Sequence, residues 1–217
     1  HEFQTPLTSI KAAASALLSD PPPGEPARGE LVSIVDEETD RLSRLVTDAI
    51  QMARLEAGRI QLRCENHSVA ALVQSAIRDA EGALAGRPVD LRLASGLPPV
   101  HADFDLLGLA LRQVLGNALK FSPPGSPLAI EARSLDGSVV VTVTDHGPGI
   151  PDGEQQRIFE KFYRGAATKP QVAGAGMGLA IAREILRAHG GDICVKSSPG
   201  HGAEFSLVIP VRGEDRR

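Results

Sequence analysis

Residues 138–150 have the sequence SVVVTVTDHGPGI, a predicted strand followed at once by an aspartate and two glycines. This order places Asp145 at the end of the strand, where ligands collect. A carboxylate there can accept a hydrogen bond from an exocyclic amine such as that of adenine. Gly147 and Gly149 have no side chain and let the backbone approach a flat ring closely. A plain glycine turn, which is common, is the alternative interpretation.

The segments around this strand predict one sheet with helices on one face. Residues 128–134 and 138–144 form a hairpin that turns at Asp136-Gly137. Further strands are expected at 61–65, 89–94, 192–197 and 203–209, and helices at 69–84, from the candidate cap Asp103 to about 121, and at 178–189. This order of strands and helices indicates an α/β sandwich.

The helix that follows Asp103 has one polar face. At about 100° per residue, Gln113, Asn117 and Lys120 fall within about 60° of each other. The opposite face is apolar and consists of Phe104, Leu107, Leu111, Val114, Leu115 and Ala118. The amide oxygen of Asn117 suits Mg²⁺, which prefers oxygen ligands, and Lys120 suits phosphate. An ordinary amphipathic helix with a wet face is the competing interpretation.

A second glycine-rich stretch, GAGMGL at 174–179, leads into the helix at 178–189. Backbone N–H groups at a helix N-terminus can hold phosphate, and the helix dipole assists. The stretch lacks the Lys-Ser/Thr ending of a P-loop and does not follow a strand directly, which disfavours a dinucleotide fold. Before it lie the aromatic segment IFEKFYRG at 158–165, part of which we expect in the core, and the less apolar 166–173, a candidate mobile lid.

The first 57 residues predict two helices separated by Pro21-Pro22-Pro23-Gly24. Both carry an apolar heptad seam, interrupted by Glu38 in the second. The seam residues are Phe3, Leu7, Ile10, Ala14 and Leu17, then Leu31, Val35, Leu42, Leu45, Ala49 and Met52. A lone hairpin buries little surface, so we expect two chains to pair into a four-helix bundle, a homodimer. Packing of the hairpin on the rest of its own chain is the alternative.

The chain starts with HEFQTPL, and helical phase places His1 on the exposed side of the first seam. A neutral imidazole there is a nucleophile that awaits a phosphoryl donor. Glu2 could orient the ring or take its proton. Taken alone, an exposed histidine at a chain start carries no functional meaning.

Composition narrows the class of protein. Of 217 residues, 42% are hydrophobic and only 3% aromatic, so the core consists mainly of Leu, Ile, Val and Ala. The net charge is −4 and no basic stripe occurs, which argues against nucleic acid as a partner. Cys64 and Cys194 lack metal-type spacing; reduced thiols and a disulfide both remain open. There is no membrane-spanning run or signal peptide, and the absence of an initial Met indicates a fragment.

In combination, these pieces resemble the sensor histidine kinases of two-component systems over essentially the whole chain. His1–Leu7 looks like their phosphoacceptor motif, usually His-Glu-x-x-Thr-Pro-Leu, and residues 117–123 look like the Mg-binding Asn motif. Residues 145–149 and 174–179 look like the two glycine motifs, and 159–164 like the Phe motif. The helical spacing also resembles, more softly, the KdpD-like potassium-responsive kinases.

The resemblance implies a dimerisation and histidine phosphotransfer domain at 1–57, and at 58–217 a catalytic ATP-binding domain shared with gyrase and heat-shock chaperone ATPases. It implies a protein histidine kinase that uses ATP and Mg²⁺ to phosphorylate His1 and passes the phosphate to an aspartate of a response-regulator receiver domain. Thr5 resembles the residue of kinases that also dephosphorylate their regulator. We expect the chain in the cytoplasm, with the full-length protein attached to the inner membrane through a missing upstream region.

The resemblance also assigns roles to single residues. Asn117 would hold Mg²⁺, Lys120 would contact phosphate, Asp145 would bind the adenine amine, and His1, Glu2 and Thr5 would be catalytic. The remaining nucleotide-binding residues would be Gly147, Gly149, Phe159, Arg164, Gly174, Gly176, Gly178 and Leu179.

Three departures from the family pattern stand out. Gln113 occupies a position that is often Asn, and its role is open. His146 replaces a frequent Asn, and no role is assigned to it. His1 has no residue before it, so we expect fraying of its helix to impair transfer. Three rival functions are a gyrase- or chaperone-type ATPase, a Ser/Thr-directed kinase on the same sandwich, and a degenerate nucleotide-binding scaffold. The first two would not need the His1 hairpin.

Overall fold

The computed structural model describes residues 3–56, 61–165 and 176–211. The described residues up to Met52 form one compact unit, and those from Ala53 onward form a second. The predicted division at residues 57 and 58 stays a prediction. Within the described ranges, no helix combines the length and the apolar character that crossing a membrane requires. Cys64 and Cys194 are both free thiols, so the disulfide alternative does not hold.

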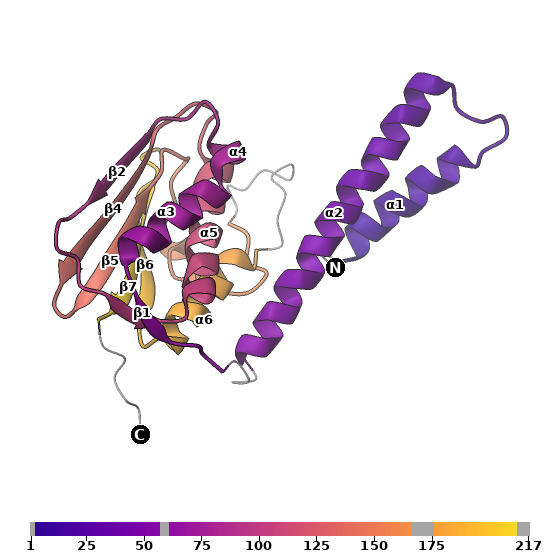
Figure 1. The fold of residues 1–217 in the computed structure, drawn as a ribbon. Coiled ribbons are helices and arrows are strands. Elements are labelled where there is room, and N and C mark those ends of the chain that lie inside the picture. Colours follow the sequence, from indigo (N-terminus) through magenta and orange to yellow (C-terminus); the bar gives the residue numbers. More distant parts are fainter. Residues whose placement is uncertain (1–2, 57–60, 166–175, 212–217) are drawn as a thin grey trace. The chain divides into compact units, whose positions relative to one another are not determined.

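The first unit is the predicted helical hairpin (Figure 1). Helix α1 spans Gln4–Leu17 and helix α2 spans Glu25–Glu56, on either side of the proline-rich loop. Leu45 and Met52 of the predicted seam are buried, as is Ala13 of α1. Glu38, which interrupts the seam, forms an ion pair with Arg41 at 3.5 Å, but its buried Oε2 has no hydrogen-bond partner among the described residues.

One seam residue differs from the expectation. Leu7 is 52% exposed, because the hairpin by itself does not cover that side of α1. Val32, Val46 and Ile50 of α2 are likewise 43–53% exposed. The hairpin therefore presents apolar side chains that its own two helices leave in contact with solvent.

The second unit is the predicted α/β sandwich (Figure 1). Its sheet has the strand order β2-β4-β5-β7-β6. The strands are β2 Val89–Leu93, β4 Leu128–Leu135, β5 Ser138–Thr144, β6 Asp192–Ser197 and β7 Ala203–Pro210. All neighbours are antiparallel except β2 and β4, which are parallel. The predicted hairpin of β4 and β5 is confirmed, with Asp136 and Gly137 at φ of 48° and 76° in its turn.

Three longer helices cover one face of this sheet (Figure 1). They are α3 Val69–Asp79, α5 Phe104–Phe121 and α6 Gly178–Ala188. Fully buried aliphatic side chains such as Leu111, Leu115, Ile181 and Ile185 join α5 and α6 to the sheet. Each such side chain contributes about 1.5–3 kcal/mol on leaving water, so the core forms with almost no aromatic residue.

Two local expectations were wrong in detail. The strand expected at 61–65 is β1, Glu65–His67, which pairs with β3, Val100–Ala102, in a separate two-stranded sheet. A three-residue strand such as β3 is too short to show a period in the sequence. The helix expected at 69–84 is broken at Ala80 into α3 and the one-turn α4, Glu81–Leu84.

Candidate functional site

Asp145 lies buried, 5% exposed, directly after β5. Its backbone N–H donates to the carbonyl of Ala203 at 2.9 Å, which extends the ladder with β7 by one bond. Its Oδ1 accepts from the N–H of Gly147 at 2.7 Å. Burial raises the pKa of this carboxyl above the usual range, while the backbone amides of Gly147 and Ala203 oppose the rise. The carboxylate is thus fixed in direction at the end of the strand.

The two glycines after Asp145 make close backbone approaches. A Cβ on Gly147 would lie 2.9 Å from Asp145 Oδ1 and 3.1 Å from the carbonyl oxygen of Phe121. Gly149 has φ of 76°, and a Cβ there would overlap the carbonyl of Ser198. A side chain fits at neither place, so the motif brings its backbone against the end of α5 and against the loop after β6.

Helix α5 presents the polar face that its sequence predicts. Leu107, Leu111, Val114, Leu115 and Ala118 are buried, whereas Gln113 and Asn117 are half-buried and Lys120 is exposed. Phe104, predicted for the core, is half-buried and packs on His67 with 5.1 Å between ring centroids. The Lys120 ammonium lies 4.9 Å from the Phe121 ring centroid. Asp103 caps the N-terminus of the helix, because its Oδ1 accepts a hydrogen bond from the N–H of Leu106 at 3.1 Å.

Gln113 faces the start of α6. A Cβ on Gly178, the first residue of that helix, would lie 2.5 Å from Gln113 Oε1. The amide therefore sits where α6 begins, one turn before Asn117 on the same helix. Gly178 leaves the space that this amide occupies.

The second glycine motif packs against the aromatic segment before it. Gly176 has φ of 68°, and a Cβ there would lie 2.6 Å from the carbonyl oxygen of Tyr163. Met177 is buried and precedes α6, and Leu179 is half-buried. Phe159 and Arg164 are also half-buried. Gly174 lies outside the described residues.

Contacts that the sequence did not predict join these pieces. Ser122, just after α5, is buried, and its hydroxyl accepts from the N–H of His146 at 3.3 Å. The ring of His146, which had no assigned role, makes a 3.0 Å contact from Nδ1 to the carbonyl of Pro127. Arg87 donates to the carbonyls of Leu119 and Ser122 at 3.0 and 3.1 Å and so caps the C-terminus of α5. An arginine that caps a distant helix leaves no local signal.

His189 connects the C-terminus of α6 to the N-terminus of α5. It ends α6, is 8% exposed, and its Nε2 accepts from the N–H of Asp103 at 3.0 Å. Its Nδ1 lies 2.7 Å from the carbonyl of Ile185 and donates to it. The N-cap of α5 and the C-terminus of α6 are therefore tied together, while Gln113 and Gly178 meet at the opposite end of α6.

The site residues fall into three groups. Those that follow β5, those on α5, and those around Gly176 and Gly178 come together through the contacts above. Thr5 is exposed in α1, in the other unit, and is not part of this group. His1 and Glu2 lie outside the described residues. In the described part of the chain, no group of three or more His, Cys, Asp or Glu residues could hold a metal ion.

Two family models match the chain. The model described as histidine kinase-, DNA gyrase B-, and HSP90-like ATPase matches residues 102–213. The model of the His Kinase A (phospho-acceptor) domain matches residues 1–58. The chain belongs to the sensor histidine kinase family.

Curated histidine kinases are similar to almost the whole chain. The alginate biosynthesis sensor protein KinB of Pseudomonas aeruginosa is 35% identical over 97% of this chain and 36% of its own length. The signal transduction histidine-protein kinase/phosphatase MprB of Mycolicibacterium paratuberculosis is 34% identical over 98% of this chain and 42% of its own length. The chain thus spans less than half the length of these two sensor histidine kinases.

Solved histidine kinase structures share the fold. ShkA in complex with AMPPNP has a TM-score of 0.73 and 31% identity, over 98% of this chain and 44% of that one. ThkA in complex with the response regulator protein TrrA has a TM-score of 0.81 over 100% of this chain and 60% of that one. At 23% identity, the likeness to ThkA speaks for the fold alone.

Proposed function

We propose that the chain binds ATP with Mg²⁺ at the site on α5, β5 and α6, and that it phosphorylates His1. The observation that carries the proposal is the junction of α5 with both glycine motifs, through Phe121 and Gly147 on one side and Gln113 and Gly178 on the other. A buried carboxylate suited to an amine lies beside the first motif, and a helix N-terminus suited to phosphate follows the second. The similar protein ShkA was crystallised in complex with the ATP analogue AMPPNP, which supports ATP as the ligand.

The residues on α5 fit Mg²⁺ and phosphate. Asn117 is half-buried on the polar face and offers an amide oxygen one turn after Gln113, which faces the start of α6. Lys120 is exposed on the same face, where its charge can reach a phosphate. When bound, Mg²⁺ would neutralise phosphate charge, while the protein contributes position and electrostatic stabilisation.

In the proposed reaction, a ring nitrogen of His1 attacks the γ-phosphorus, the N–P bond forms, and the bond to the bridging oxygen of ADP breaks. The ring proton passes to Glu2. The phosphohistidine then gives its phosphoryl group to an aspartate of a response-regulator receiver domain, a proposal supported by the match of residues 1–58 to the phospho-acceptor domain of histidine kinases. Thr5 is proposed to assist removal of phosphate from that regulator, and the relative MprB is named as a kinase/phosphatase.

We further propose that the hairpin pairs with a second copy. The exposed apolar side chains of Leu7, Val32, Val46 and Ile50 support this, because a second hairpin would remove them from water. The cytoplasmic location and the attachment of the full-length protein to the inner membrane stay predictions.

Incubation with γ-labelled ATP and Mg²⁺ tests the reaction. We expect label on the protein that is labile in acid and stable in base, and no label on the H1Q variant. Label that survives on H1Q would contradict the assignment of His1. Release of free phosphate without labelled protein would instead favour the ATPase alternative. The same assay on the full-length protein controls for the position of His1 at the start of this chain.

A further inference from the structure

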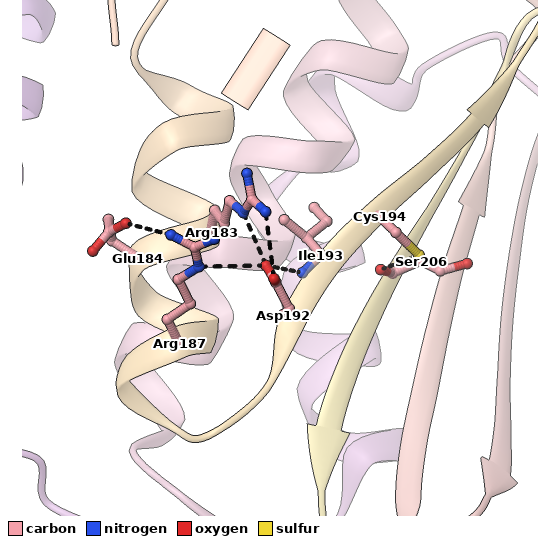
Figure 2. A network of polar contacts seen from close by, with 7 residues as sticks. All are labelled: Arg183, Glu184, Arg187, Asp192, Ile193, Cys194 and Ser206. Atoms are coloured by element: carbon pink, nitrogen blue, oxygen red, sulfur yellow. Dashed lines mark hydrogen bonds and ion pairs between the residues drawn. The ribbon is translucent and has the colours of Figure 1, made fainter. Parts of the chain in front are cut away.

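Arg183 on α6 contacts two other segments of the chain, and Figure 2 shows the first contact, with Asp192. Its Nε donates to Asp192 Oδ1 at 3.0 Å, and a second nitrogen lies 3.5 Å from Oδ2, at the start of β6. Its guanidinium carbon lies 5.2 Å from the centroid of the Phe159 ring, on the segment before the second glycine motif. Arg183 is therefore paired with a carboxylate and placed over an aromatic face at the same time.

Asp192 is well suited to fix this guanidinium. It also accepts from the N–H of Ile193 at 2.8 Å, which holds the carboxylate in direction. Burial alone would raise the pKa of Asp192, but the hydrogen bonds from Arg183 and Ile193 and the charges of Arg183 and Arg187 hold it below the usual range. The Asp192 carboxyl is therefore ionised at neutral pH. The Arg183 side chain is 29% exposed, so the contact is partly shielded from water.

Phe159 belongs to a small folded turn at 157–165. The N–H of Glu160 donates to the carbonyl of Arg157 at 2.8 Å, and the N–H of Tyr163 donates to the carbonyl of Glu160 at 3.3 Å. The Arg157 guanidinium lies 4.4 Å from the Tyr163 ring centroid and closes the turn on itself. These three contacts lie within the turn and hold its shape.

The turn touches the site at its far end. The carbonyl of Tyr163 makes the close approach to Gly176, two residues before α6 begins. Because hydrogen bonds join Glu160 to Arg157 and Tyr163 to Glu160, we expect a displacement of Phe159 to be passed on to Tyr163 beside Gly176. The contact between Phe159 and Arg183 is one contact that places this turn on α6.

We infer that Arg183, fixed by Asp192, is a positioning residue of the nucleotide site: it docks the 157–165 turn on α6 and thereby places the backbone around Gly176 for phosphate. This rests on the proposed function of the site. Arg183 acts through Phe159 and Tyr163 and does not itself contact the nucleotide.

The chain offers a matched control on the same helix. Arg187 lies one turn after Arg183, with its Nε 3.7 Å from Asp192 Oδ1 and another nitrogen 3.6 Å from Glu184 (Figure 2). It therefore shares the charge, the helix and the acidic neighbour of Arg183. The ring contact with Phe159 belongs to Arg183. Loss of Arg187 removes a comparable ion pair and leaves the docked turn in place.

The test is the dissociation constant of ADP with Mg²⁺, measured by calorimetry on the whole chain. R183A is expected to bind roughly five-fold more weakly or worse, as loss of a partly shielded cation–π contact implies. R187A is expected to bind as the unmodified chain does. In R183D/D192R the ion pair is reversed, so the free energy of unfolding should be close to that of the unmodified chain. A carboxylate then faces the negative face of the Phe159 ring, so the affinity for ADP should stay low.

A double-mutant cycle tests the route of the effect. If Arg183 acts through Phe159, R183A adds no further loss in the F159A background. Should R183A fail to fold, R183K keeps the charge without the planar group and is expected to bind about two- to three-fold more weakly. Equal affinity of R183K or R183A and the unmodified chain, equal losses in R183A and R187A, or additive losses with F159A would each overturn the inference. Failure of the unmodified chain to bind ADP would instead overturn the proposed function.

Discussion

The two glycine motifs of the site are held in different ways. The close neighbours of Gly147 are Oδ1 of Asp145 and the backbone carbonyl of Phe121 at the end of α5, and that of Gly149 is the backbone carbonyl of Ser198 in the loop after β6. At Gly178 the close neighbour is the end of the Gln113 side chain, and at Gly176 the close neighbours are backbone atoms of Phe162 and Tyr163. At Gly149 a rigid backbone carbonyl leaves no room for a side chain, whereas at Gly178 the neighbour is a flexible side chain that can move.

The largest effect is expected at Gly149. G149A places a Cβ against the Ser198 carbonyl at a φ of 76°, so both the backbone and the packing are strained. We expect a loss of about 3 kcal/mol in the free energy of unfolding, together with loss of ADP binding. Urea denaturation and calorimetry measure the two. A tolerated G149A would remove the distinction between the motifs.

The role of Asp145 beside the first glycine motif can be tested by the pH dependence of ADP binding. Because burial raises the pKa of Asp145, its carboxylate is protonated at a higher pH than an ordinary aspartate with a pKa of about 3.9. Protonation removes an acceptor, so ADP affinity should begin to fall at a higher pH than protonation of an ordinary aspartate would cause. A titration of ADP binding against pH measures this.

The D145N variant is the control for that titration. It should bind roughly ten- to hundred-fold more weakly, and its affinity should not follow this titration. The raised pKa also means that the ionised form costs stability above that pKa, and that this cost is relieved as the pH falls. D145N should therefore unfold no more easily at neutral pH, and a clear loss of stability would contradict the account of Asp145.

Gly116 on α5 lies outside both glycine motifs and serves as the control for the glycine substitutions. It is exposed, and a Cβ there would meet no atom within 4 Å. G116A should raise the free energy of unfolding by about 0.8 kcal/mol, because alanine favours a helix interior more than glycine does. ADP affinity should stay unchanged. Thermal denaturation detects the gain, and a loss of stability would show that α5 is more crowded than its contacts indicate.

The smallest effect is expected at Gly178. The obstacle in G178A is Gln113 Oε1, the far end of a flexible side chain, which can rotate away. The free energy of unfolding should change by less than about 0.5 kcal/mol. The double variant Q113A/G178A, which removes the obstacle, should equal Q113A in stability. A large loss in G178A that Q113A fails to relieve would place Gly178 in the same class as Gly149.

The sequence predicted those parts of the fold in which apolar residues recur at regular spacing or residues typical of a turn occur. The buried face of α5 follows from residues spaced by three and four, and the β4–β5 hairpin follows from Asp136-Gly137. The break at Ala80 and strand β3 leave no such signal, because each involves only a few residues. Tertiary contact alone decides them.

The site residues likewise divide into those that local sequence predicts and those that depend on distant contacts. Asp145, Asn117 and the glycines were predicted because the backbone order around each is local. Arg87, Ser122 and His189 were missed, since each contacts a partner more than twenty residues away in sequence and resembles an ordinary polar residue. Glycine spacing could not reveal that Gln113 faces Gly178, because this contact depends on how α5 and α6 cross.

The pairing of β2 with β4 bears on how the sandwich folds. β4 and β5 are joined by a tight turn, so their contacts are local, whereas the parallel register joins Leu91 to Ile130 across β3 and the whole of α5. Contacts so distant in sequence close late and slowly. The β4–β5 hairpin should therefore form before β2 joins it.

Asn117 lies inside the segment that this late pairing encloses. An intermediate with the hairpin alone would hold Asp145 at a strand end but would not hold α5 against it. In refolding experiments, competence to bind ADP should consequently appear with the slowest phase of the kinetics. The nucleotide can then serve as a reporter of completed folding, and it would stabilise only the finished sandwich.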